Sequence, residues 1–266
     1  MNQVTRALSE FKEMDELSAL DTPIHRLHPL VKLLSTIAYI FTVVSFDKYA
    51  FSGLAAMVLY PVLLFALTGI PVRTCFHKLR IVLPLVCAVG IVNPFFDREI
   101  MLRVSNLAIS GGVISMLTLM MKGVFSLMAS FLLIATTSMD DICMALRKLH
   151  VPNVIVTLLL LTYRYVSVMI ENVSIMTDAY HLRAPGQKGI HISAWGSFVG
   201  QLLLRSMDQA TELYQSMVLR GYNGEFTYAQ AKKCTPGDIV YLLAAVGAFL
   251  LLRYVPVANL LGGMVI

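Results

Sequence analysis

Charged residues are scarce in this sequence. Asp, Glu, Lys and Arg make up 14% of the 266 residues, whereas 57% are hydrophobic, and an average soluble domain carries roughly 25% charged residues. Several stretches are apolar on all sides over the length needed to cross about 30 Å of hydrocarbon. This composition excludes an ordinary water-soluble domain and predicts a polytopic helical membrane protein.

Cysteines are also few, and no two of them have the spacing of a metal site or a disulfide framework: Cys75, Cys87, Cys143 and Cys234 are scattered along the chain. We expect them to be reduced and mostly buried. No resident metal or other cofactor is predicted. The net charge of +5 is interpreted as an excess of Lys and Arg on the cytoplasmic side of a membrane, so no nucleic-acid partner is expected.

Sequence motifs of catalysis are missing. The chain has no GxxxxGK[ST] phosphate loop, so we do not expect it to hydrolyse ATP by the P-loop route. It has no HExxH motif and no recognisable Ser or Cys nucleophile signature. The four N-terminal spans show no acidic or histidine cluster of the kind that proton-driven carriers use. The sequence therefore predicts a protein that is not an enzyme and that takes its energy from a partner.

Five apolar stretches are long enough to be membrane spans: 31–46, 49–70, 81–96, 107–137 and 239–257. Basic residues gather in segments 71–80 and 139–150, and the positive-inside rule places both segments and the N-terminus in the cytoplasm. The first 20 residues lack the apolar core of a signal peptide, so no cleavage is expected. We predict an all-α fold with about five spans in the cell membrane and a cytoplasmic-facing module of amphipathic helices.

Two amphipathic helices are predicted, over residues 154–182 and 193–219. Each carries a charged stripe on one face: Arg164, Glu171 and Asp178 in the first helix, and Arg205, Asp208 and Glu212 in the second. Charges facing lipid are costly, so we expect the helices to lie at the membrane boundary or in the cytoplasm. Their charges would pair with one another or with a partner. The expected domains are 1–138 (four spans), 139–235 (the coupling-helix module) and 236–266 (the last span).

An internal repeat with an offset of 37 residues aligns the ends of these two helices. Leu182-Arg183-Ala184 matches Leu219-Arg220-Gly221, and Glu171-Asn172 matches Asp208-Gln209. A structural interpretation is that arginine in a last turn complements the helix dipole and that the glycine caps the helix. The functional interpretation is that each guanidinium binds carboxylates or carbonyls in a groove of another protein.

Five segments together resemble the T component (EcfT) of energy-coupling factor transporters, and within it the cobalt-type CbiQ group: LHPLVKLL (27–34), MDDICMALRKLHVP (139–152), TYRYV (162–166), HLRAPG (181–186) and MVLRGYNGEF (217–226). The family's paired arginine motifs typically read Ala-Arg-Gly, and here they read Leu-Arg-Ala and Leu-Arg-Gly.

This resemblance implies a scaffold that holds two ABC-type ATPase subunits and a membrane-embedded, substrate-binding S component. Arg183 and Arg220 would dock into the two ATPases, and ATP-driven closure would tilt the S component. The implied cargo is cobalt or nickel, with a shared T component for vitamin uptake as the alternative. The hypothesis requires both arginines to be cytoplasmic, which would fail if the 154–182 helix crossed the membrane.

Other classes of function are a stand-alone secondary transporter and a membrane-embedded enzyme that uses the charged face of the 154–182 helix. A transporter of that kind is expected to show inverted repeats with broken helices, whereas the repeat here is direct. His25 and His28 could lie on one helix face and bind a metal, but no carboxylate or cysteine completes such a site.

Overall fold

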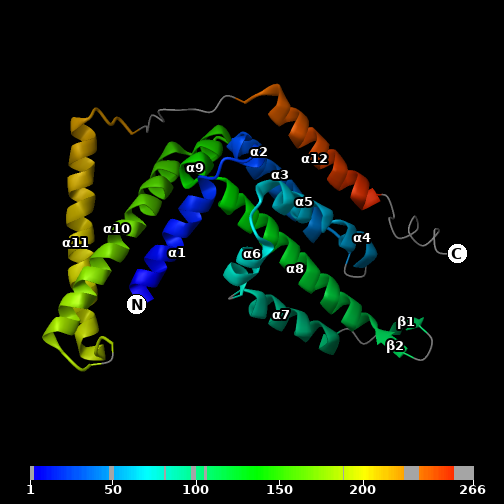
Figure 1. Ribbon diagram of the computed structural model, residues 1–266, viewed down its shortest axis with the longest axis horizontal. Coiled ribbons are helices and arrows are strands. Elements are labelled where there is room, and N and C mark those ends of the chain that lie inside the picture. Colours follow the sequence, from blue (N-terminus) through cyan, green and yellow to red (C-terminus); the bar gives the residue numbers. More distant parts are fainter. Residues whose placement is uncertain are drawn as a thin grey trace. The chain divides into compact units, whose positions relative to one another are not determined.

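The computed structural model (Figure 1) describes residues 3–47, 51–80, 82–96, 100–104, 107–187, 189–224 and 234–254. Outside these ranges lie the start of the expected 49–70 span, the first residue of the 81–96 span, the end of the 239–257 span and the end of the 217–226 motif. Helices form nearly all of the described elements, which confirms the all-α class.

The chain divides into two compact units. Unit 1 contains Met1–Leu17 and Met139–Ala231, and unit 2 contains Ser18–Ser138 and Lys232–Ile266. The polypeptide therefore passes from one unit to the other three times. The expected division into 1–138, 139–235 and 236–266 stays a prediction about functional domains.

Unit 2 is built around α8 (Gly111–Thr136), which packs against α3 (Pro29–Val44), α5 (Leu59–Thr68) and α7 (Leu83–Phe96). Its other helices are α2 (Pro23–Arg26), α4 (Phe51–Ala56), α6 (Val72–Leu79) and α12 (Pro236–Tyr254). Pro236 lies in the first turn of α12, where its missing N–H costs nothing.

The core of unit 2 is aromatic. The ring of Tyr39 lies 4.7 Å from that of Tyr60 and 5.3 Å from that of Phe249, measured between ring centroids. The Tyr39 hydroxyl donates a 2.9 Å hydrogen bond to the backbone carbonyl of Met57, so the buried phenol keeps a polar partner. These contacts join α3 and α12 to α5 and to the chain that leads into it.

Two expectations about the membrane segments are wrong in detail. Residues 107–110 do not begin the fourth span, because β2 (Leu107–Ser110) pairs antiparallel with β1 (Ile100–Val104) and α8 begins only at Gly111. The 49–70 stretch is not one helix, since it breaks between α4 and α5. Hydropathy detects apolar runs. A strand or a short break between helices does not change the hydropathy of the run that contains it.

Three helices are long and apolar enough to cross a membrane: Gly112–Thr136 in α8, Asn153–Arg183 and Pro236–Arg253 in α12. Gly53–Thr68 with Val72–Leu79 forms a pair bent by 117°, which would make a fourth span. The described residues therefore provide three or four candidate spans by length and composition, and α3 is a shorter apolar helix. The protein is a polytopic helical membrane protein.

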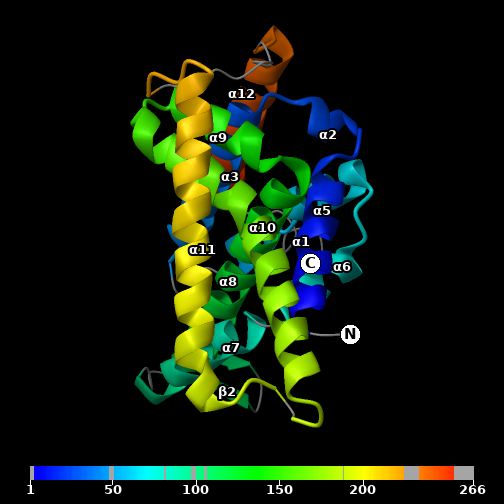
Figure 2. The ribbon, with the colours of Figure 1, turned by 90° about the vertical axis from the view of Figure 1, so that its left-hand side faces the viewer.

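Unit 1 contains α1 (Gln3–Ser18), α9 (Met139–Lys148), α10 (Asn153–Arg183) and α11 (Ile192–Leu219). Figures 1 and 2 show α10 and α11 as two long rods joined at one end by residues 184–191. Both predicted helices, 154–182 and 193–219, agree with these bounds to within one residue. The His191 side chain caps α11 by accepting a hydrogen bond from the N–H of Ser193.

The conspicuous MDDICMALRKLHVP segment forms α9 and the corner that leads into α10. His150 has a left-handed backbone, with φ of 63°. Its N–H bonds to the carbonyl of Arg147, and the N–H of Val151 bonds to that of Leu146, which is the Schellman ending of a helix. Pro152 then starts the next helix, so this segment produces a sharp turn between two helices.

Candidate coupling site

The end of α10 presents a leucine and an arginine to solvent. Arg183 is the last residue of the helix and is exposed, and 84% of the surface of Leu182 is accessible. Ala184 follows with φ of −126°, and its N–H bonds to the carbonyl of Tyr180 at 3.0 Å. The left-handed residue comes later, at Gly186, with φ of 94°.

The end of α11 presents the same pair with a different cap. Leu219 is 89% accessible, and Arg220 is exposed directly after it. Gly221 has φ of 86°, and the N–H groups of Gly221 and Tyr222 bond to the carbonyls of Val218 and Met217 at 2.9 and 3.0 Å. This Schellman ending requires a residue that tolerates positive φ, which explains the glycine. The repeat in the sequence therefore matches the exposed side chains but not the backbone.

The two tips lie at opposite ends of one helix. Arg183 ends α10 at the junction with the start of α11, and Arg220 follows the last residue of α11 (Figures 1 and 2). With 28 residues and a rise of 1.5 Å per residue, α11 is about 42 Å long. The arginines are therefore too far apart to act in one pocket.

All six charged stripe residues are exposed: Arg164, Glu171 and Asp178 on α10, and Arg205, Asp208 and Glu212 on α11. Within the described ranges, the three charges on α11 form no ion pair. The pairing of the stripe charges with one another or with a partner stays a prediction.

The opposite side of α11 is apolar and uncovered. None of the residues of α11 is buried. Seven of its exposed large hydrophobic side chains recur at helical spacing: Ile192, Trp195, Val199, Leu203, Met207, Tyr214 and Val218. At 100° per residue these side chains occupy one side of the helix, roughly opposite the charged stripe. We call this series the α11 apolar face, and it gives the helix two chemically different sides.

At two equivalent positions of the repeat, one atom of a side-chain amide lacks a hydrogen-bond partner. The Nδ2 atom of Asn172 and the Oε1 atom of Gln209 are inaccessible to solvent and have no hydrogen-bond partner among the described residues. Buried polar atoms are nearly always paired, because an unpaired one costs about 1–3 kcal/mol. The hairpin of α10 and α11 therefore keeps unused hydrogen-bonding groups.

His25 and His28 have structural partners. The Nδ1 atom of His25 lies 2.6 Å from Thr22 Oγ1 and its Nε2 atom 3.3 Å from the carbonyl of Ala135, while Nδ1 of His28 accepts a bond from the N–H of Leu30. Among the described residues, no three His, Cys, Asp or Glu side chains gather as a metal site would require.

Comparison with known proteins identifies relatives of this chain. The family model for CbiQ, described as cobalt transport protein, matches residues 21–233. An uncharacterized protein of Methanocaldococcus jannaschii is 24% identical over 191 residues, which cover 68% of this chain and 65% of that protein.

Two further relatives are named for metals. Nickel permease LarQ of Lactiplantibacillus plantarum is 26% identical over 44% of this chain and 42% of its own length. Cobalt transport protein CbiQ of Rhodobacter capsulatus is 31% identical over 43% of this chain and 49% of its own length. The matches thus span less than two thirds of each relative. Because the family model covers most of this chain, the protein belongs to the CbiQ family, which is described as cobalt transport protein.

Proposed function

We propose that this protein is the transmembrane scaffold of an energy-coupling factor importer. It passes ATP-driven motion from two ATPase subunits to a substrate-binding S component in the cell membrane. The observation that carries the proposal is the pair of exposed Leu-Arg tips at the C-terminal ends of α10 and α11. The names of the relatives LarQ and CbiQ support nickel or cobalt as the cargo.

The chemistry of each tip suits docking into a groove. A fully buried leucine contributes about 1.5–3 kcal/mol relative to an exposed one, and both Leu182 and Leu219 are exposed in this chain. The adjacent guanidinium makes bidentate, charge-assisted hydrogen bonds that fix orientation. Two like tips about 42 Å apart fit two like grooves, one on each subunit of an ATPase pair.

The two sides of α11 suit two kinds of partner. The α11 apolar face matches a helical membrane protein such as an S component, because apolar surface of this extent is normally covered. The charged stripe faces the other way and matches a water-exposed partner. The unpaired amides of Asn172 and Gln209 are groups that gain partners when α10 and α11 shift against each other during the transport cycle.

Arg183→Ala with Arg220→Ala is the variant that tests this function. In mild detergent, the tagged wild type is expected to co-purify with two ATPase chains and to support ATP hydrolysis, and the double variant is expected to lose both. Arg73→Ala is the matched control, since Arg73 is an exposed arginine of α6 in unit 2. A wild type that purifies without ATPases would exclude the scaffold function.

Membrane topology provides a second test, because α10 is long and apolar enough to cross a membrane. Cysteines placed at Leu182 and Leu219, in a chain without its native cysteines, report the side of each tip. The proposal expects both to react with a membrane-impermeant thiol reagent in inside-out vesicles and neither to react in intact cells. Labelling of one position from each side would mean that the chain between the two tips crosses the membrane, and both arginines could not then dock cytoplasmic ATPases.

A further inference from the structure

Residues 21–32 of unit 2, here called the anchor segment, contain an unusual set of buried polar side chains. His25, His28 and Lys32 are all buried, and Lys32 is only 5% accessible. The segment overlaps LHPLVKLL (27–34), which the docking function of the arginine tips does not use. Burying an ammonium group costs free energy unless the group is well paired. The contacts of the Lys32 ammonium group therefore show which parts of the fold the segment holds in place.

Lys32 holds the end of α8. Its Nζ atom donates to the carbonyl of Thr136 at 2.7 Å and to that of His25 at 3.1 Å. Thr136 is the last residue of α8, where carbonyls lack partners within the helix and the helix dipole favours a positive charge. The His25 ring lies 3.3 Å from the neighbouring carbonyl of Ala135. The anchor segment therefore supplies the cap that α8 does not make for itself.

Asp238 fastens the start of α12 to the same segment. One carboxylate oxygen accepts a 3.1 Å hydrogen bond from the backbone N–H of His28. The other accepts 2.8 Å bonds from both the N–H and the hydroxyl of Thr235, and the bond from the N–H is the carboxylate half of a capping box. Thr235 directly precedes α12, so one buried carboxylate ties the beginning of this helix to the beginning of α3.

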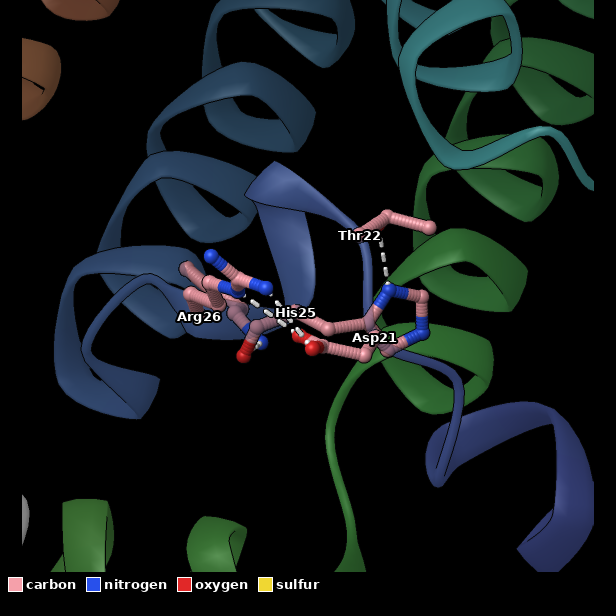
Figure 3. Close-up of polar contacts among 5 residues, drawn as sticks. Asp21, Thr22, His25 and Arg26 are labelled. Carbon is pink, nitrogen blue, oxygen red and sulfur yellow. Dashed lines mark hydrogen bonds and ion pairs between the residues drawn. The ribbon is translucent and has the colours of Figure 1, made fainter.

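The entry of the anchor segment is also fixed. Figure 3 shows Thr22 bonded to the His25 ring, with 2.6 Å between Oγ1 and Nδ1. It also shows the two parallel 2.7 Å bonds from the Arg26 guanidinium to the Asp21 carboxylate. The hydrogen bond from Arg26 lowers the pKa of Asp21, and this exposed pair keeps both charges near neutral pH.

Along the sequence, these contacts fall close to each point at which the chain passes from one unit to the other. The chain crosses after Leu17, Ser138 and Ala231, and the bonded groups Asp21, Thr136 and Thr235 each lie within a few residues of one crossing. Close to the second crossing, Thr137 is buried and its hydroxyl has no hydrogen-bond partner among the described residues. Most buried polar side-chain atoms have a hydrogen-bond partner, so this hydroxyl is an exception close to the second crossing.

We propose that Lys32 is a positioning residue for coupling. On the proposed scaffold function, on which this inference rests, movement of unit 1 reaches unit 2 along the three crossings. The anchor segment holds the unit 2 ends of these crossings together so that they move as one body. Without the Lys32 ammonium the end of α8 loses its cap, and ATP hydrolysis continues while less of the motion reaches the S component.

Lys122 provides a matched control within the same pair of helices. It extends from α8 to the other end of α3, where its Nζ atom donates to the carbonyls of Val44 and Phe46. Lys32 caps α8 from α3, and Lys122 caps α3 from α8. Both lysines thus donate hydrogen bonds to backbone carbonyls, at opposite ends of α3. Of the two, only Lys32 bonds to a group close to a crossing.

The test compares Lys32→Met and Lys122→Met in the complete complex reconstituted in liposomes. The readouts are ATP hydrolysed per metal ion taken up, co-purified ATPase and the temperature of thermal unfolding. For Lys32→Met we expect this ratio to rise at least about fivefold, the lower end of typical coupling energies, with ATPase still bound. For Lys122→Met we expect this ratio to stay nearly unchanged, even where the unfolding temperature falls by as much as it does for Lys32→Met.

Asp238→Asn is the second variant, in case Lys32→Met does not fold. It keeps the side-chain volume and weakens the bonds to His28 and Thr235, so the ratio should rise in the same direction. An unchanged ratio in Lys32→Met, or in Asp238→Asn where Lys32→Met does not fold, overturns the inference while the scaffold function stands. Equal rises in Lys32→Met and Lys122→Met also overturn it, because the effect would follow stability alone. Wild type without bound ATPase overturns the scaffold function and the inference with it.

Discussion

The two units differ in how far their apolar side chains are buried by other helices of the same chain. In unit 2, apolar side chains such as Tyr39, Leu54 and Met57 are completely buried by other helices of the same chain. In unit 1, α11 is just as helical and carries many large hydrophobic residues, yet none of its residues is buried. Unit 2 is therefore stabilised by its own core, whereas the hairpin of α10 and α11 presents surfaces that lipid or partner proteins must cover.

Leucine-to-alanine substitutions should separate the two units most clearly. Leu132 of α8 is 1% accessible, and Leu132→Ala is expected to lower the free energy of unfolding by about 2–5 kcal/mol, from lost transfer energy and the cavity left behind. Leu219→Ala removes an exposed side chain and should change that free energy by no more than about 0.5 kcal/mol. Thermal unfolding in detergent measures both.

The same two variants should reverse their order in ATPase binding. Leu219→Ala is expected to weaken binding of the ATPase pair by about 10–100-fold, because the leucine is buried only in the complex. Leu132→Ala should leave the affinity of the folded fraction unchanged. A titration of purified ATPase against each variant tests this, and equal affinities for Leu219→Ala and wild type would remove the leucine from the docking tip.

Glycine-to-alanine substitutions are expected to change the stability of the protein in opposite directions in the two units. A Cβ atom on Gly123 of α8 would lie 2.5 Å from Cγ1 of Val86, so Gly123→Ala should destabilise the protein by about 1–3 kcal/mol through overpacking. At Gly200 of α11 nothing lies within 4 Å of such an atom. Gly200→Ala should stabilise the protein by up to about 1 kcal/mol through helix propensity. Two shifts of the same sign in thermal unfolding would contradict the difference in packing.

The sequence predicted the helices of unit 1 better than it predicted their ends. Apolar periodicity and breaker residues placed α10 and α11 to within one residue, because both signals are local. The repeat suggested two equivalent caps, but Gly221 is left-handed whereas Ala184 is not. Arg183 and Arg220 share a sequence context, and only the backbone shows that different hydrogen bonds end the two helices. The role of these arginines stays a prediction.

Other features depended on contacts far apart in the chain. Lys32 was visible only as part of the 27–34 motif, and its partner Thr136 lies 104 residues away, where no local pattern indicates it. The strand pair of Ile100–Val104 and Leu107–Ser110 is short and apolar, and such a run resembles the start of a membrane helix. Separation along the chain and ambiguous short runs are the physical reasons for these omissions.

The smallest expected effect concerns α9, a part of unit 1 that has buried side chains as unit 2 does. Cys143 of α9 is fully buried, and burial, with a smaller contribution from the negative charge of Asp140, raises the pKa of its thiol to about 11. Cys234 in unit 2 is exposed. Because the thiolate is the reactive form, a maleimide at about pH 7.5 should label Cys234 readily and Cys143 hardly at all.

Raising the pH should then increase the labelling of Cys143. The direction of this change follows from the direction of its pKa shift. A folded-state pKa above the ordinary value of 9.0 means that folding favours the neutral thiol, so its contribution to stability is complete below pH 9 and is lost as the pH rises toward 11. Labelling of Cys143, located by peptide mass spectrometry, should therefore increase over this range together with a slight fall in the unfolding temperature. Rapid labelling of Cys143 at neutral pH would instead show that α9 opens as readily as the uncovered hairpin of α10 and α11, and the packed corner of unit 1 would then depend on partners as well.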